Sequence, residues 1–80
     1  MKENTLLSLK ESVSNSDRIK NLILGNIQTE EKKVIRLNLV YLTYNFQSKT
    51  VLLEYYVEDD DYPNVEISFT ELTELFKNKP

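Results

Sequence analysis

The feature that most constrains the fold is a central stretch of two apolar, alternating runs with a short polar segment between them. The first run, Val34–Phe46, is rich in β-branched, leucine and tyrosine residues and lacks glycine and proline, as is typical of a strand. Gln47-Ser48-Lys49 follows and predicts a hairpin turn. The second run has apolar residues at every other position, at Val51, Leu53, Tyr55 and Val57. We therefore expect an antiparallel hairpin with one buried face.

The apolar positions of the first run change side part-way along it. They fall at Ile35, Leu37, Leu39 and Tyr41, and then at Val40, Leu42, Tyr44 and Phe46. This switch predicts a β-bulge, or a strand whose far end is covered on its second face as well. The run spans 13 residues, against about eight in its neighbour, so part of its edge is expected to stay unpaired. Such an edge can pair with a partner strand or with a second copy to form a homodimer.

A helix is predicted near the start of the chain. Residues 4–14 carry Leu6, Leu9 and Val13 at helical spacing, and Asn4 or Thr5 can cap this helix. Four residues that favour caps and turns then interrupt it, at 14–17.

Residues 18–27 fit two interpretations. Ser16 can start a helix in which Ile19, Ile23 and Ile27 share one face, with Gly25-Asn26 near its end. A strand is the alternative, because the same isoleucines also fit a period of two. We prefer the helix.

The residues after the hairpin predict a turn, a short strand and a helix. Residues 59–64 form the turn, and Val65 and Ile67 face inward in the strand. Ser68 and Glu71 have the spacing of a capping box. An apolar stripe then lies along the helix, at Leu72, Leu75 and Phe76. Acidic residues lie early in the helix and basic ones late, which suits its dipole, at Glu71, Glu74, Lys77 and Lys79.

These elements form one domain, residues 1–80, because a chain of 80 residues is too short for two separate cores. The predicted fold class is α+β: an N-terminal helix or helices, a three-stranded antiparallel β-meander, and a C-terminal helix packed on one face of the sheet.

The composition excludes several kinds of chemistry. The chain has no cysteine, no histidine and one glycine, which excludes zinc fingers, iron–sulfur sites, disulfides, imidazole-based catalysis and a glycine-rich phosphate loop. Asp59 and Asp61 begin a calcium-loop pattern, but Pro63 follows and no glycine supplies the turn. A turn crowded with acids is expected to be convex and wet, whereas catalysis by paired carboxyls needs a concave apolar cleft. We expect no metal, no cofactor and no enzymatic activity.

No apolar stretch has the length of a signal peptide or a membrane span. Near the N-terminus only Leu6-Leu7-Ser8-Leu9 is apolar in character, and Lys10 follows it. We expect a cytoplasmic protein that does not contact membranes.

Charge is distributed unevenly along the chain. Residues 1–53 have a balance of +3, whereas residues 54–80 have a balance of −6. Direct binding to nucleic acid needs clustered lysine and arginine, so it is not expected. An acidic region of this kind is better suited to a basic protein surface.

The acidic residues and two tyrosines predict a partner-binding patch. Glu54, Tyr56 and Glu58 face outward from the second run, and the acidic turn adjoins them. Repulsion among these carboxylates would be relieved by a basic partner, while tyrosine beside acid suits a contact surface. The alternative is that the turn only keeps two strands solvated. The predicted site consists of Glu54, Tyr56, Glu58, Asp59, Asp60, Asp61, Tyr62 and Glu66.

In its architecture the chain resembles the small acidic inhibitors of phages and mobile elements, anti-CRISPR proteins among them. The resemblance rests on size, lack of cysteine and histidine, the helix–meander–helix order and the acidic patch. Such proteins often occupy the basic nucleic-acid channel of a nuclease as DNA mimics. The resemblance implies a stoichiometric inhibitor or decoy whose partner is a basic host protein, such as a nuclease or another nucleic-acid-binding protein. The alternative is a self-associating structural or adaptor protein that uses its exposed strand edge.

Overall fold

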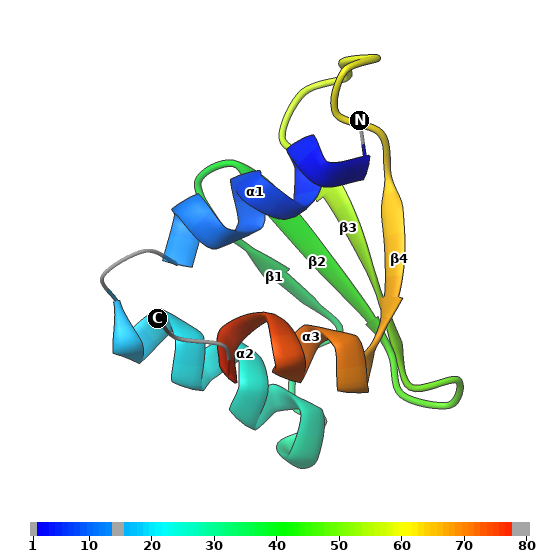
Figure 1. Cartoon of the computed structure of the whole chain (residues 1–80). Coiled ribbons are helices and arrows are strands. Elements are labelled where there is room, and N and C mark those ends of the chain that lie inside the picture. Colours follow the sequence, from blue (N-terminus) through cyan, green and yellow to red (C-terminus); the bar gives the residue numbers. More distant parts are fainter. Residues whose placement is uncertain (1, 14–15, 78–80) are drawn as a thin grey trace.

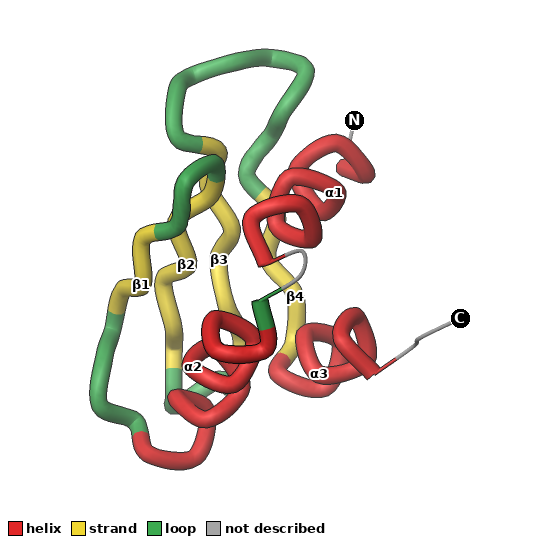
Figure 2. The backbone as a smooth tube through the Cα atoms, turned by 90° about the vertical axis from the view of Figure 1, so that its left-hand side faces the viewer, coloured by secondary structure: helices red, strands yellow, loops and turns green. Residues whose placement is uncertain are grey.

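The computed structural model describes residues 2–13 and 16–77, which form an α+β fold (Figure 1). Four strands form one antiparallel sheet in the order β1-β2-β3-β4, and all three helices lie on the same side of it (Figure 2). The fold class is therefore confirmed, but the sheet has four strands rather than three. Along the chain the elements are α1 (Lys2–Val13), α2 (Asp17–Thr29), β1 (Val34–Arg36), β2 (Val40–Asn45), β3 (Thr50–Tyr55), β4 (Val65–Ser68) and α3 (Phe69–Lys77).

The helix predicted over residues 4–14 is α1, and it begins earlier, at Lys2. Asn4 and Thr5 consequently lie inside its first turns and are not its caps. The predicted last residue, Ser14, lies outside the described residues.

The segment with two interpretations is a helix, α2, as preferred. Ser16 is its cap: the Ile19 N–H donates to the Ser16 Oγ over 3.2 Å. The helix continues past Gly25-Asn26 and ends at Thr29, followed by Glu30 in a left-handed conformation with φ 54°. The Glu30 N–H donates to the Asn26 carbonyl oxygen, so the helix ends without using its glycine.

The long strand predicted over Val34–Phe46 is wrong, because the chain reverses inside it. Residues 37–39 join β1 to β2, and the Leu37 N–H donates to the Val40 carbonyl oxygen over 2.9 Å. Ile35 therefore pairs with Leu42, and both face the helices. The change of phase marks a tight turn rather than a bulge. The part of this strand's edge that was expected to stay unpaired is absent as a result, because β1 pairs with β2.

The hairpin between β2 and β3 is confirmed, with its turn at residues 46–49. Asn45 accepts hydrogen bonds from the backbone N–H groups of Gln47 and Ser48, and Lys49 takes a φ of 60°. β3 is shorter than predicted, because it ends at Tyr55. Val57, expected on the inward face, is 47% exposed.

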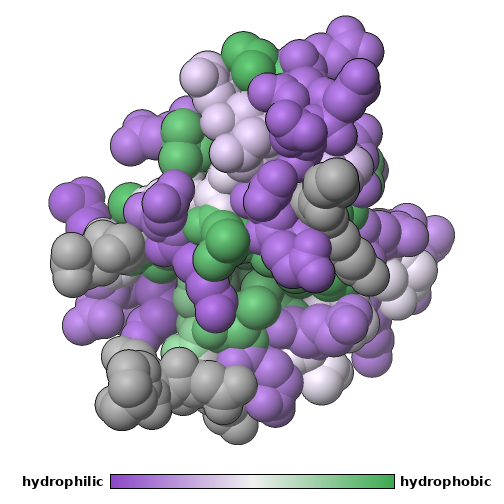
Figure 3. All heavy atoms as spheres, turned by 45° about the horizontal axis from the view of Figure 1, so that its top comes forward, coloured by the Kyte–Doolittle hydropathy of each residue, from purple (hydrophilic) through white to green (hydrophobic). Residues whose placement is uncertain are grey.

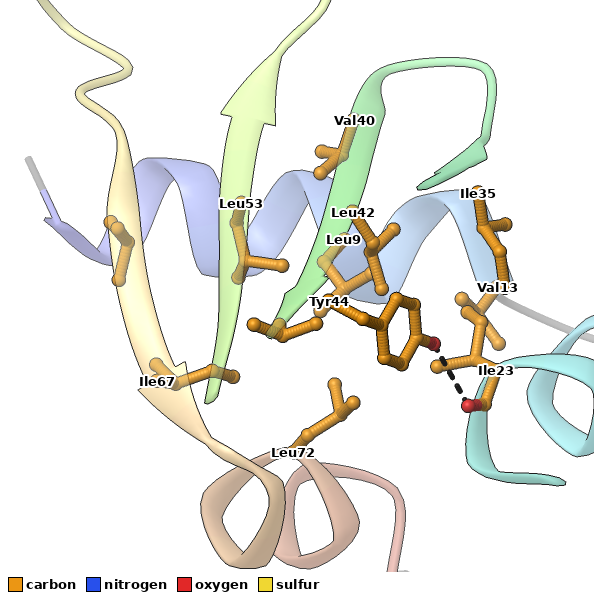
Figure 4. Close-up of a cluster of buried hydrophobic side chains, with 12 residues drawn as sticks. Leu9, Val13, Ile23, Ile35, Val40, Leu42, Tyr44, Leu53, Ile67 and Leu72 are labelled. Carbon is orange, nitrogen blue, oxygen red and sulfur yellow. Dashed lines mark hydrogen bonds between the residues drawn. The ribbon is translucent and has the colours of Figure 1, made fainter. Parts of the chain in front are cut away.

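The core lies between the sheet and the helices (Figure 4). Leu9, Ile23 and Leu72, one from each helix, are fully buried with Leu42 and Leu53 of the sheet. Each such side chain contributes about 1.5–3 kcal/mol to folding through removal of its surface from water.

Tyr44 brings a polar group into this core. Its hydroxyl donates to the Ile23 carbonyl oxygen over 2.9 Å, the dashed line of Figure 4. Burial raises the pKa of Tyr44 to about 12, even though Asn26 stabilises the ionised form.

α3 has the predicted capping box. The Glu71 N–H donates to the Ser68 Oγ over 3.0 Å, and the Ser68 N–H donates to the Glu71 carboxylate over 2.8 Å. Leu72 is buried, and Leu75 and Phe76 pack against the core. The predicted roles of the Lys77 and Lys79 side chains lie outside what the structure describes. In the described part of the chain, no helix has both the length and the apolar character needed to cross a membrane.

Candidate functional site

The candidate site is built around the acidic loop, residues 56–64, which connects β3 to β4. Figure 1 shows the loop extending past the end of the sheet, beside the start of α1. Figure 3 brings this end of the molecule forward and shows mostly hydrophilic residues there, with a few apolar ones among them.

Asp59 gives the acidic loop its internal structure. Its carbonyl oxygen accepts from the Tyr62 N–H and its carboxylate accepts from the Asp61 N–H, each over 2.9 Å. These bonds form a turn closed by an aspartate side chain. Part of the acidic run is therefore used in shaping the loop.

The first turns of α1 hold the far end of the acidic loop. Asn4 donates through Nδ2 to the Asp61 carbonyl oxygen over 2.7 Å, and Thr5 donates through Oγ1 to the Pro63 carbonyl oxygen over 2.6 Å. Thr5 is fully buried. From the sequence, Asn4 and Thr5 were expected only as caps. Their partners in the loop lie 57 and 58 positions away along the chain, and no local pattern signals contacts over such separations.

Three tyrosines pack together at the base of the acidic loop. The rings of Tyr55 and Tyr62 stack with their centroids 4.0 Å apart, and the Tyr56 ring meets Tyr55 edge-on at 4.8 Å. Burial raises the pKa of Tyr55, and the charges of Tyr56, Tyr62, Asp59 and Glu11 raise it further. Tyr55 was expected to belong to the core, but it is only half-buried.

The acidic loop and the sheet border an open hollow of about 530 Å³, here called the tyrosine hollow. It is formed by Tyr41, Glu54, Tyr55, Tyr56, Val57, Glu58, Asp59, Asp60, Tyr62, Pro63 and Asn64. The expectation that the acidic turn is convex is therefore wrong on this side. The hollow forms because α1 holds one end of the loop while the tyrosine stack supports the other.

Six of the eight predicted site residues lie around the tyrosine hollow: Glu54, Tyr56, Glu58, Asp59, Asp60 and Tyr62. The other two do not. Asp61 is exposed, and its carbonyl oxygen accepts from Asn4. Glu66 lies opposite Leu52 on the face of the sheet away from the helices, and it accepts a hydrogen bond from the Thr50 Oγ1 over 3.1 Å.

The charge around the hollow is one-sided. Four carboxylates line it, and none of the described lysines or arginines does. A salt bridge joins Lys20 to Asp17 in α2, away from the loop. Over the same residues, no group of three or more acidic side chains is placed to hold a metal ion.

Arg36 lies next to the hollow without lining it. Its guanidinium carbon is 5.9 Å from the centroid of the Tyr41 ring. Three adjacent strands place these groups in register: Arg36 of β1 pairs with Tyr41 of β2, which pairs with Glu54 of β3. A guanidinium group, an aromatic ring and a carboxylate thus form one row at the border of the hollow.

Comparison of the chain with known protein families, with curated proteins and with solved structures found no match.

Proposed function

We propose that this chain is a small, non-catalytic protein-binding module that acts as a stoichiometric inhibitor or decoy. Its acidic loop and tyrosine hollow bind a basic surface of a partner protein. The observation that supports the proposal is the gathering of Glu54, Glu58, Asp59 and Asp60 around one hollow that also carries tyrosines.

Electrostatics favours a basic partner. Carboxylates held close together repel one another in the free protein, and opposite charge relieves that repulsion. Complementary surfaces also increase the rate of association and make binding sensitive to salt. The tyrosine rings add contact area that loses little conformational entropy on binding.

The proposed class of partner is a nuclease or another nucleic-acid-binding protein, because such proteins carry the clustered lysine and arginine that the acidic loop complements. Direct binding of nucleic acid to this chain is not part of the proposal, since the loop repels phosphate. We place the protein in the cytoplasm and propose no catalytic role. The lack of histidine and cysteine supports the absence of catalysis.

A matched pair of double variants tests the proposal. Glu58→Lys/Asp60→Lys reverses charge at the hollow and spares Asp59, whose carboxylate shapes the loop. Glu30→Lys/Glu31→Lys makes the same change in net charge between α2 and β1, where both residues are exposed. Each form is immobilised and exposed to a cell lysate at about 50 mM and about 500 mM salt, which spans weak and strong screening.

The wild type and the Glu30/Glu31 control should retain basic nucleic-acid-binding proteins at low salt and release them at high salt. Added DNA should compete for these proteins. The Glu58/Asp60 variant should fail to retain them. Retention of the same proteins by that variant would falsify the proposal.

The alternative of self-association through a strand edge has lost the observation behind it. The strand that was expected to overhang its neighbour folds into a hairpin instead. The outer strands of the sheet are short, with three residues in Val34–Arg36 and four in Val65–Ser68. The homodimer stays a prediction of the sequence, to be checked by sedimentation over a range of concentrations.

A further inference from the structure

We infer that the tyrosine hollow is a receptor for a guanidinium group, and that it binds an arginine side chain of the partner in preference to a lysine. This inference rests on the proposed function and names the chemistry that the site selects. It starts from the rings that line the hollow rather than from its charge.

Four of the five tyrosines of the chain line the hollow: Tyr41, Tyr55, Tyr56 and Tyr62. The stack of Tyr55 on Tyr62 orders two of these rings, while Tyr56 is 46% exposed and offers contact area. The volume of about 530 Å³ lies within the range of roughly 300–1,000 Å³ found for sites that hold small ligands.

Three carboxylates remain available to a ligand. Asp59 is engaged within the loop, but among the described residues no hydrogen bond or salt bridge occupies the carboxylates of Glu54, Glu58 and Asp60. Each can accept two parallel hydrogen bonds from one guanidinium group.

Rings and carboxylates together favour arginine over lysine. A guanidinium group is planar, stacks on aromatic faces, and presents five N–H donors in a fork that matches a carboxylate. An ammonium group is compact and more strongly hydrated, and it cannot bind a carboxylate in the same two-pronged way. Charge alone would not distinguish the two side chains.

Arg36 provides an independent observation. Its guanidinium already lies over the ring of Tyr41, a residue of the hollow, in the same row as Glu54. The molecule itself thus shows a guanidinium group accommodated on one of these rings.

Two synthetic peptides, octa-arginine and octa-lysine, serve as probes of equal charge. Isothermal titration calorimetry with the wild type should give an affinity for octa-arginine on the order of 5-fold higher than for octa-lysine, as expected for one or two ring contacts. Tyr56→Leu should reduce this ratio to about 2-fold or less, and Tyr56→Phe, which keeps the ring, should preserve it. Tyr56 is exposed enough that neither change disturbs the core.

A second measurement needs no variant. In NMR spectra, the ring protons of Tyr56 and Tyr62 should shift on addition of octa-arginine, and shift less on addition of octa-lysine. Equal affinity for both peptides, or an unchanged ratio in a folded Tyr56→Leu, overturns the inference while the proposed function stands. Failure of both peptides to bind at low salt contradicts the proposed function itself.

Discussion

Tyr44 illustrates how one residue connects the sheet to a helix. Its ring packs beside those of Phe46 and Phe69, and its hydroxyl donates to the Ile23 carbonyl oxygen. A buried hydroxyl without a partner is costly, so this hydrogen bond allows a tyrosine to occupy a core position.

The pKa of Tyr44 predicts a loss of stability at alkaline pH. The phenol ionises near pH 10.0 in the unfolded chain and near pH 12 in the native protein. Its contribution to the free energy of unfolding is therefore complete below pH 10 and decreases as the pH rises toward 12. By pH 11 the loss should be about 1 kcal/mol. Urea unfolding at pH 8 and pH 11 measures it, and Tyr44→Phe should show a smaller decrease than the wild type. An equal decrease in both forms would contradict this assignment.

Thr5 is the residue that positions the acidic loop. Thr5→Val keeps the shape of the side chain but removes the donor to the Pro63 carbonyl oxygen. We expect a loss of about 1–2 kcal/mol in the free energy of unfolding, and faster amide exchange in residues 59–64. The control is Thr70→Val, the same change at an exposed position of α3, which should stay within about 0.5 kcal/mol of the wild type. Loop exchange that is unchanged in Thr5→Val would show that the Thr5 hydroxyl does not hold the loop.

At the scale of elements, local patterns predicted most of the fold. Ser16 as a cap, the turn at residues 46–49 and the capping box of α3 each depend on residues within a few positions of one another. The turn at residues 37–39 was missed, because half-buried leucines flank its single polar residue, Asn38. Its apolar character resembles that of a strand, and only the change of phase indicated it.

The candidate site was predictable in part for the same reason. The acidic and tyrosine residues of the loop all lie within residues 56–62, so composition identified them. Their arrangement around a hollow depends on contacts with Asn4 and Thr5 and on Tyr41 from another strand. Such long-range contacts leave no periodic signal in one sequence, which is why Tyr41 and Tyr55 were not assigned to the site.

The junction of β4 and α3 gives a prediction at this scale. The Phe69 N–H donates to the carbonyl oxygen of Lys49, in the turn between β2 and β3, and the Ser68 N–H donates to the Glu71 carboxylate. The capping box thus starts α3 and also protects the last residue of an outer strand. Ser68→Ala should lower the free energy of unfolding by about 1 kcal/mol. Glu74→Ala, an exposed change on the same helix, should have little effect.

A double-mutant cycle of Ser68→Ala and Glu71→Ala tests the reciprocal nature of the box. Each side chain accepts a hydrogen bond from the backbone N–H of the other residue. The two losses in the free energy of unfolding should therefore be coupled by about 0.5 kcal/mol or more. Strict additivity would indicate two independent contacts.

At the scale of the whole molecule, the separation of charge opposes stability and, under the proposed function, favours binding. The acidic part of the chain, residues 54–80, carries most of the hollow and little compensating positive charge. A basic partner surface would relieve this repulsion on binding.

The charges of the hollow destabilise the free protein and are proposed to bind the partner, so removing them should change stability and binding in opposite directions. Glu58→Gln/Asp60→Asn removes two of the four charges at the hollow and keeps the size of both side chains. We expect it to raise the free energy of unfolding by about 0.5 kcal/mol at low salt, and to lose this advantage near 0.5 M salt, where screening is nearly complete. The same variant should bind octa-arginine more weakly at low salt. The control is Glu30→Gln/Glu31→Gln, two exposed residues outside the hollow. It should show neither the gain in stability at low salt nor the weaker binding of octa-arginine. Urea unfolding and calorimetry at both salt concentrations provide the measurements. If neutralising the hollow destabilised the protein at low salt, those carboxylates would belong to the folding of the loop rather than to the binding of a partner.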